Sequence, residues 1–466
     1  MRSIVFLTLY WIIFIPANAH AYLDPASGNA LVSFFVALAG ALIYSVKSVF
    51  YKLFNKTISL QNSPPPSLLG DQRPVIFSEG KTYWTTFRPI VEEFIKQKKH
   101  FRYITLDIHD PALTLDCEFM ESKRFPKSKL GFARIAKINA PLMLSTTPNI
   151  GSPDYPLKRP AGVAKLVHVF HAMVDVSCYR KGSLDFYDSV LMTGDHEEKY
   201  IRIVEEARGI RKKELIVTGL PCLDDLYRQK IESSISQKSN KRTTVLVAPS
   251  WGAKGCFNEY GTGFVRTLSD AGFNVIIRLH PHSYIFEPSS VEIWQSQTKK
   301  LPNVRWDSNS FGTHAMSEAD ILVSDTSSIR FDFAFLYSRP VITLQIPKEN
   351  RDIFEGCYME ETWADTIAPH IGRVLTKDTI HNLGVVVQST VEDFSKEKMI
   401  ELRDETVANF GKSAPTIVNY LIEQSETLSM SPEAEKLRTE LNSVKQEVTE
   451  LKKKIEQLLS ETQEGY

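Results

Sequence analysis

Residues 319–332 read ADILVSDTSSIRFD, and this stretch decides the fold that the sequence predicts. It starts with a short apolar run, 321–324, of the kind that forms a buried strand. A hydroxyl-rich turn follows at 325–328 and opens an apolar helix that extends to about Leu336. A buried strand that leads through a turn into a helix indicates an α/β architecture.

The same alternation of strands and helices continues on both sides of this stretch. Before residue 229, amphipathic stretches separate short β-rich runs, and the predicted strands are 75–77, 103–106, 142–144, 166–170, 190–192 and 215–217. After the polar run 229–241 the alternation restarts, with predicted strands at 244–247, 274–278, 321–324 and 341–344. The pattern predicts two doubly wound parallel-sheet domains, 74–228 and 243–425, which face a cleft at the carboxyl ends of both sets of strands.

Length and composition limit the classes of protein to consider. The chain has 466 residues, 43% of them apolar, which excludes a disordered or low-complexity chain. Its 55 Lys and Arg balance 55 Asp and Glu, and a net charge of zero argues against nucleic acid as a partner. Five cysteines at wide spacing, with no C-x-x-C among them, argue against a disulfide framework and indicate a reducing compartment.

The amino-terminal region has the pattern of a signal and a membrane anchor. Residues 1–21 combine an early arginine, an apolar run and A-x-A sites, which is typical of a secretory signal peptide. Within the predicted anchor, 22–56, residues 26–46 carry no charge and are long enough to span a bilayer as a helix. Lysines follow directly, so we expect a single-pass inner-membrane protein with its body on the cytoplasmic side, joined by the linker 57–73. An uncleaved helical hairpin is the alternative and leaves the body on the same side.

The carboxyl-terminal region, 432–460, has the heptad pattern of a coiled coil. Apolar residues recur with 4-3-4-3 spacing from Leu437 to Leu458. The flanking charges attract across a parallel pair, so the pattern predicts a parallel homodimer through residues 437–458. The alternative is that an amphipathic helix of a partner protein packs on these apolar residues.

Two of the predicted strand ends carry candidate catalytic or phosphate-binding side chains. His171 ends the apolar run 166–170 and is a candidate general base, although a histidine beside apolar residues is often a satisfied core or edge residue. After the strand 244–247, Ser250, Trp251 and Gly252 form a candidate donor-binding loop, in which Gly252 lets the backbone approach a ligand and Ser250 can contact a phosphate. The alternative for this second loop is a Pro/Gly turn in which Trp251 packs.

A third loop, 278–282, presents Arg278, His280 and His282 where a proline stops the strand. These side chains can bind an anion through positive charge or hydrogen bonds. A metal site at His280 and His282 is a weak possibility, because two ligands without an acidic partner rarely suffice.

The fourth loop is the hydroxyl-rich turn of the opening stretch. Asp325, Thr326, Ser327 and Ser328 converge on a helix amino terminus, where unpaired N–H groups favour an anion such as phosphate. The alternative is that Asp325 with its neighbours is simply a good helix N-cap. Asp332 lies one helical turn beyond Ser328 and either contacts a ribose hydroxyl or pairs with a neighbouring base.

Taken together, four motifs resemble a known family. The order HVFHA at 168–172, APSWG at 248–252, RLHP at 278–281 and SDTSSIRFD at 324–332 is similar to the CDP-glycerol:poly(glycerophosphate) glycerophosphotransferases, which polymerise teichoic acids. The resemblance covers roughly residues 72–425. It implies a GT-B fold, a CDP-alditol donor, a cell-envelope polymer or lipid-linked acceptor, and no obligatory metal or other cofactor.

The resemblance also implies roles for individual residues. His171 matches the proposed base histidine, and Ser327 and Ser328 match the donor-phosphate loop. His280 matches the histidine of the family's strand-end His-Pro and is the second candidate catalytic residue. The reaction implied is transfer of a polyol phosphate with release of CMP. Two other functions stay open on the residues alone, namely a GT-B glycosyltransferase that uses a nucleotide sugar and a non-catalytic nucleotide-binding scaffold.

Overall fold

The computed structural model describes residues 71–232, 242–308, 313–347, 353–429 and residue 443. The predicted signal peptide 1–21, the anchor 22–56 and nearly all of the linker 57–73 lie outside the described residues. The predicted coiled coil 432–460 also lies outside them, apart from residue 443. No helix of the described segments is long and apolar enough to cross a membrane.

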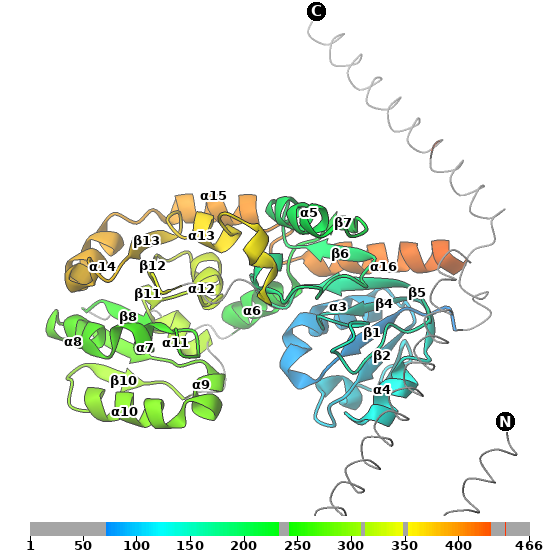
Figure 1. The fold of residues 1–466 in the computed structure, drawn as a ribbon, viewed down its shortest axis with the longest axis horizontal. Coiled ribbons are helices and arrows are strands. Elements are labelled where there is room, and N and C mark those ends of the chain that lie inside the picture. Colours follow the sequence, from blue (N-terminus) through cyan, green and yellow to red (C-terminus); the bar gives the residue numbers. More distant parts are fainter. Residues whose placement is uncertain (1–70, 233–241, 309–312, 348–352, 430–442, 444–466) are drawn as a thin grey trace, which may run out of the picture. The chain divides into compact units, whose positions relative to one another are not determined.

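The first sheet has seven parallel strands in the order β3-β2-β1-β4-β5-β6-β7 (Figure 1). Its strands are β1 (Val75–Ser78), β2 (Phe101–Thr105), β3 (Met120–Arg124), β4 (Asn139–Ser145), β5 (Gly162–Val169), β6 (Ser189–Met192) and β7 (Glu214–Val217). The helices between them are α3 (Trp84–Lys96), α4 (Lys129–Ile135), α5 (His196–Arg208) and α6 (Pro221–Glu232). Helix α5 ends at Gly209, whose φ of 61° is a left-handed conformation that glycine adopts without strain.

The second sheet has six parallel strands in the order β10-β9-β8-β11-β12-β13. Its strands are β8 (Thr244–Val247), β9 (Asn274–Ile277), β10 (Val304–Trp306), β11 (Ile321–Ser324), β12 (Val341–Leu344) and β13 (Gly372–Leu375). Its helices are α7 (Cys256–Tyr260), α8 (Gly263–Asp270), α9 (Pro281–Phe286), α10 (Pro288–Thr298), α11 (Thr313–Glu318), α12 (Ile329–Tyr337), α13 (Trp363–Ile367), α14 (Leu383–Glu392) and α15 (Lys396–Thr406).

The prediction of an α/β fold with two parallel sheets is therefore confirmed. The three strands that the sequence did not predict, β3, β10 and β13, all lie at sheet edges. Strand β3 has the sequence MESKR, in which only Met120 is buried. An edge strand is covered on fewer sides than a central one, so it needs no continuous apolar run and gives little signal in the sequence.

The last helix, α16 (Ser413–Ser429), packs on the first sheet although it follows the second along the chain. Ile417, Val418 and Leu421 belong to the same buried cluster as Phe94 of α3 and Leu142 of β4. The sequence predicts one domain over 243–425, whereas in the structure residues 413–429 complete the core of the first. Burial of this apolar face joins α16 to the first sheet.

Candidate active site

His171 follows β5, and Thr146 follows the neighbouring strand β4, so parallel pairing brings both residues to the carboxyl ends of the strands. Thr146 Oγ1 lies 3.0 Å from His171 Nδ1, and the Tyr83 ring packs against the imidazole in a T-shaped contact with 5.2 Å between centroids. Burial lowers the pKa of His171 below its ordinary value of 6.5. The ring is therefore neutral at pH 7, as a general base must be.

A second histidine, His168, lies behind His171 within the sheet. It is fully buried, its Nε2 lies 3.0 Å from the Tyr179 hydroxyl, and burial lowers its pKa to about 3. His168 is thus a neutral core residue among Phe170, Tyr179 and Tyr187. The sequence leaves open that a histidine beside apolar residues is a satisfied core residue. His168 has that environment, whereas His171 is half-buried at the strand end.

In the second sheet, the carboxylate of Asp325 holds two of the predicted loops together. Its Oδ1 accepts the backbone N–H groups of Ser250 at 2.8 Å and Ser327 at 3.2 Å, and its Oδ2 accepts that of Cys256 at 2.8 Å. Asp325 is fully buried. The structure therefore gives Asp325 a positioning role: it fixes the loop after β8 against the loop after β11, and its oxygens face backbone donors.

The turn at 326–328 is shaped as an anion site at the start of α12. Ser328 is the N-cap residue of α12, but its side chain accepts no backbone N–H, so the Ser328 hydroxyl is not used for capping. Thr326 is exposed, and both serines are half-exposed. The first turn of a helix offers N–H donors and a positive dipole end, which bind an anion.

Arg330, which the sequence reasoning missed, adds a buried positive charge behind this turn. Its Nε donates to the Ser327 carbonyl at 3.1 Å, and its Nη1 donates to Thr343 Oγ1 at 3.2 Å. Burial lowers the pKa of Arg330 to about 10, so the guanidinium stays charged at pH 7. The available signal was a single basic residue inside the otherwise apolar helix IRFDFAFLY.

The loop after β9 fixes the orientation of two further predicted side chains. Arg278 Nη1 forms an ion pair of 2.7 Å with the buried carboxylate of Asp307. His280 is the N-cap of α9, and its Nδ1 accepts the N–H of His282 at 3.1 Å. Burial lowers the pKa of His280, so the neutral ring carries its proton on Nε2 and can donate it to a ligand oxygen.

Trp251 lies on the same surface as these histidines. Its ring stacks on Phe286 at 5.3 Å between centroids and meets the His282 ring edge-on at 4.9 Å. The side chain is still 44% exposed, which leaves an aromatic face for a ligand. The neighbouring Gly252 has a φ of 103° and donates its N–H to Glu287 Oε2 at 2.9 Å, so this amide is already used within the protein.

Asp332 is half-buried on α12, and no described residue forms a hydrogen bond or ion pair with its carboxyl group. Burial raises the pKa of Asp332 to about 7. The structure therefore does not show the pairing with a neighbouring base that the sequence leaves open. A carboxyl group in this state can accept from or donate to a ligand hydroxyl. Among the described residues, no three His, Cys, Asp or Glu side chains gather as metal ligands would.

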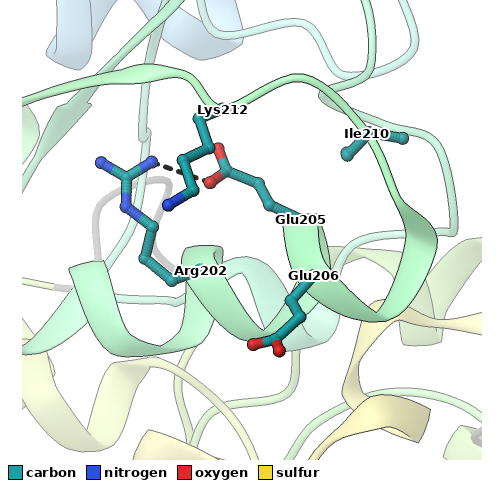
Figure 2. Close-up of a pocket in the computed structure, with 5 residues that line it drawn as sticks. All are labelled: Arg202, Glu205, Glu206, Ile210 and Lys212. Carbon is teal, nitrogen blue, oxygen red and sulfur yellow. Dashed lines mark hydrogen bonds and ion pairs between the residues drawn. The ribbon is translucent and has the colours of Figure 1, made fainter.

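A surface hollow of about 590 Å³ lies elsewhere, against α5 and the loop that follows it (Figure 2). It is lined by Arg202, Glu205, Glu206, Ile210 and Lys212. Arg202 pairs with Glu205 at 2.7 Å, as the dashed line in Figure 2 marks. The end of α5 leads to the amino end of β7, away from the strand ends that carry His171, so this hollow is separate from the candidate site.

Comparisons with known proteins bear on the family and the fold. A family model described as CDP-glycerol:poly(glycerophosphate) glycerophosphotransferase matches residues 179–422, which is more than half of the chain. The match includes His280, Ser327 and Ser328, and it begins after His171. None of the curated proteins compared matches the chain.

Two solved structures illustrate the structural likeness. A protein assigned as a UDP-N-acetylglucosamine 2-epimerase from Listeria monocytogenes superposes with a TM-score of 0.52 and 10% identity, covering 77% of this chain and 97% of its own. The wall teichoic acid polymerase TagF gives a TM-score of 0.48 and 16% identity, covering 85% of this chain and 99% of its own. The likeness to the epimerase identifies the two-sheet architecture as the GT-B fold.

Proposed function

Because the chain belongs to the CDP-glycerol:poly(glycerophosphate) glycerophosphotransferase family, we propose that it transfers a polyol phosphate from a CDP-activated donor to an acceptor hydroxyl. The donor is CDP-glycerol or a close relative. The acceptor is a cell-envelope polymer or a lipid-linked precursor of one, and CMP is released.

The observation that carries this proposal is the braced turn at 325–328. A diphosphate donor needs preorganised hydrogen-bond donors and positive charge where the leaving group develops negative charge. The turn combines the Ser327 and Ser328 hydroxyls with a helix amino terminus and the buried charge of Arg330. Asp325 fixes its position relative to the loop of Trp251.

The lowered pKa values of His171 and His280 support the following mechanism. His171 Nε2 takes the proton of the acceptor hydroxyl, in the tautomer whose Nδ1–H donates to Thr146 Oγ1. The hydroxyl oxygen then attacks the β-phosphorus of the donor, and the bond from that phosphorus to the bridging oxygen breaks. His280 Nε2–H, Arg278 and the turn at 326–328 stabilise the CMP that leaves with the negative charge.

Two variants with matched controls test these roles. We expect His171→Ala to lose turnover while it keeps donor affinity, and Ser327→Ala to weaken CDP binding. Exposed residues of the same types, His100→Ala and Ser296→Ala, serve as controls that should change neither property. Release of CMP from CDP-glycerol supports the transferase, and release of a nucleoside diphosphate from a nucleotide sugar identifies a glycosyltransferase instead. Wild-type activity of both site variants would contradict the assignment.

We further propose that residues 26–46 anchor the protein in the inner membrane with the body on the cytoplasmic side. The uncharged span and the lysines after it support this arrangement, and the five cysteines of the body are all unpaired. Deletion of residues 1–56 should shift the protein from the membrane fraction to the soluble one. Unchanged fractionation would contradict the anchor.

The heptads support a parallel homodimer through residues 437–458 as a further proposal. Sedimentation of a chain that ends near Pro432, compared with the full-length protein, tests it. An oligomeric state that does not change on truncation would remove the proposal.

A further inference from the structure

A second charged feature lies on the first domain, outside the candidate active site. Between residues 122 and 138 the chain carries six basic residues and no acidic one, and all six side chains are exposed: Lys123, Arg124, Lys127, Lys129, Arg134 and Lys137. No carboxylate of the described residues forms an ion pair with any of them. What distinguishes this segment in the first domain is therefore the run of six exposed cations without an acidic residue among them.

Four of these cations, Lys123, Arg124, Lys127 and Lys129, form what we call the basic patch. Arg124 is the last residue of β3 and is aligned with Thr105 at the end of β2. Lys127 lies in the turn that enters α4, and Lys129 is the first residue of that helix. Because the strands are parallel, the carboxyl end of β3 lies on the same side of the sheet as the carboxyl end of β5, where His171 is placed.

The strand order gives the separation between the basic patch and His171. The path from β5 to β3 crosses β4, β1 and β2, and Figure 1 shows β4, β1 and β2 in this order, with α4 beyond them. Neighbouring strands lie about 4.8 Å apart, so four steps amount to roughly 19 Å along the edge. The patch is therefore too far from the reacting hydroxyl to bind the group that reacts, but it is within reach of a chain several units long.

Three carboxylates, those of Glu79, Asp107 and Asp110, lie along this path, and each already accepts a hydrogen bond. Asp107 accepts the backbone N–H groups of Lys81 at 3.1 Å and His109 at 2.9 Å. Glu79 accepts the hydroxyl of Tyr155. The side chain of Lys81 is exposed beside them and adds a further cation between the patch and the candidate site. Positive charge on this side of the sheet is therefore concentrated at the basic patch, with Lys81 as one further cation nearer to the candidate site.

We propose that the basic patch binds phosphodiester groups of a polyanionic acceptor chain, several units behind the terminal hydroxyl that reacts at His171. This inference rests on the proposed function and specifies how the acceptor chain is bound. Lysine and arginine bind phosphate through charge-assisted hydrogen bonds, and neutralising successive phosphates releases counterions from the chain. Binding at a distance from the reacting end would retain the growing polymer between successive additions.

The local structure favours a soluble polyanion over a lipid surface as the ligand of this patch. An interfacial membrane helix needs a wide apolar face directed outward. Helix α4 has seven residues, and its Phe132 and Ile135 are buried in the protein core. Leu130, which is 60% exposed, is the one large apolar side chain of α4 directed to solvent.

The test is a pair of double charge reversals that change the net charge equally. Lys127→Glu with Lys129→Glu alters the patch, and Lys299→Glu with Lys300→Glu alters exposed lysines after α10 of the second domain. Turnover of CDP-glycerol is measured with a poly(glycerophosphate) chain and with a single-unit glycerophosphoryl acceptor. Binding of the labelled chain is measured separately by fluorescence anisotropy at several salt concentrations.

We expect the patch variant to bind the chain about tenfold more weakly at low salt, with a smaller salt dependence, because two phosphate contacts are lost. KM for the chain should rise similarly, while the single-unit acceptor and the control variant behave as wild type. Equal loss with both acceptors, or wild-type binding of the chain, overturns the proposal. Loss of binding to phosphatidylglycerol vesicles with unchanged chain binding would instead identify a membrane contact. Failure of the proposed function is distinct, because wild type would then release no CMP although chain binding remains measurable.

Discussion

Replacement of Asp325 by asparagine tests whether one carboxylate assembles the donor site. In wild type, Oδ1 accepts two backbone N–H groups and Oδ2 accepts the N–H of Cys256 at 2.8 Å. Asparagine keeps one acceptor oxygen but places an NH2 group opposite the Cys256 N–H. The variant thus loses a charge-assisted bond and leaves a buried donor unpaired, which costs about 1.5–3 kcal/mol.

This cost predicts two measurable effects. The unfolding temperature of the second domain should fall by roughly 3–12 °C, given about 2–4 °C per kcal/mol for a domain of this size. CDP affinity, measured by calorimetry, should fall about tenfold or more, because loss of the brace frees the loops that bind the donor. Asp320→Asn is the matched control: its exposed carboxylate accepts one N–H, from Thr244, at the opposite end of β11. Wild-type unfolding temperature and CDP affinity of the Asp325 variant would refute the reasoning.

Three further predictions concern the other groups of the site. Thr146→Val should lower kcat about 2- to 13-fold, since it removes one hydrogen bond of about 0.5–1.5 kcal/mol from His171. Thr146→Ser keeps the hydroxyl and should retain activity. Equal rates for both variants would contradict this role. Because burial lowers the pKa of His171 below its usual 6.5, the acid limb of the kcat/KM profile should be centred below pH 6.5. An acid limb centred above 6.5 would be inconsistent with this assignment. Burial raises the pKa of Asp332 to about 7, whereas the pKa in the unfolded chain is 3.8. Ionisation of Asp332 therefore lowers the free energy of unfolding by its full amount above pH 7 and has no effect on it below pH 3.8. Asp332→Asn should therefore gain stability in urea unfolding at pH 8, with a gain that shrinks toward pH 4, and lose donor affinity; a gain that grows as the pH falls would show the opposite linkage.

The sequence predicts the central strands and the loops at their ends because both leave local signals. Apolar runs identify β1, β4 and β11, each of which is buried along its length except for Asn139 at the start of β4. The turn at 325–328 was recognisable from its hydroxyls and the apolar helix that comes after it. Edge strands such as β3 were missed because they carry mixed side chains that partial burial permits.

The roles of individual site residues were harder to predict than their positions. Asp325 has the sequence pattern of a helix cap, and its partners Ser250 and Cys256 lie 75 and 69 residues away along the chain. In the sequence, Arg330 is only a basic residue within an apolar segment, and the role that we propose for it depends on its burial behind the turn. Hydrogen bonds of this kind form between loops that sheet order brings together, so spacing along the chain does not reveal them.

The sequence by itself determined the alternation of strands and helices, the places where strands end, and the family motifs, because periodicity and turn residues encode local burial and backbone conformation. The tertiary structure alone decided the strand order and the contacts that depend on it. Strand order puts Thr146 against His171, aligns the basic patch with the same sheet edge, and returns α16 to the first sheet. These contacts depend on which distant segments become neighbours, and that is set by burial of apolar surface over the whole domain and by pairing of parallel strands.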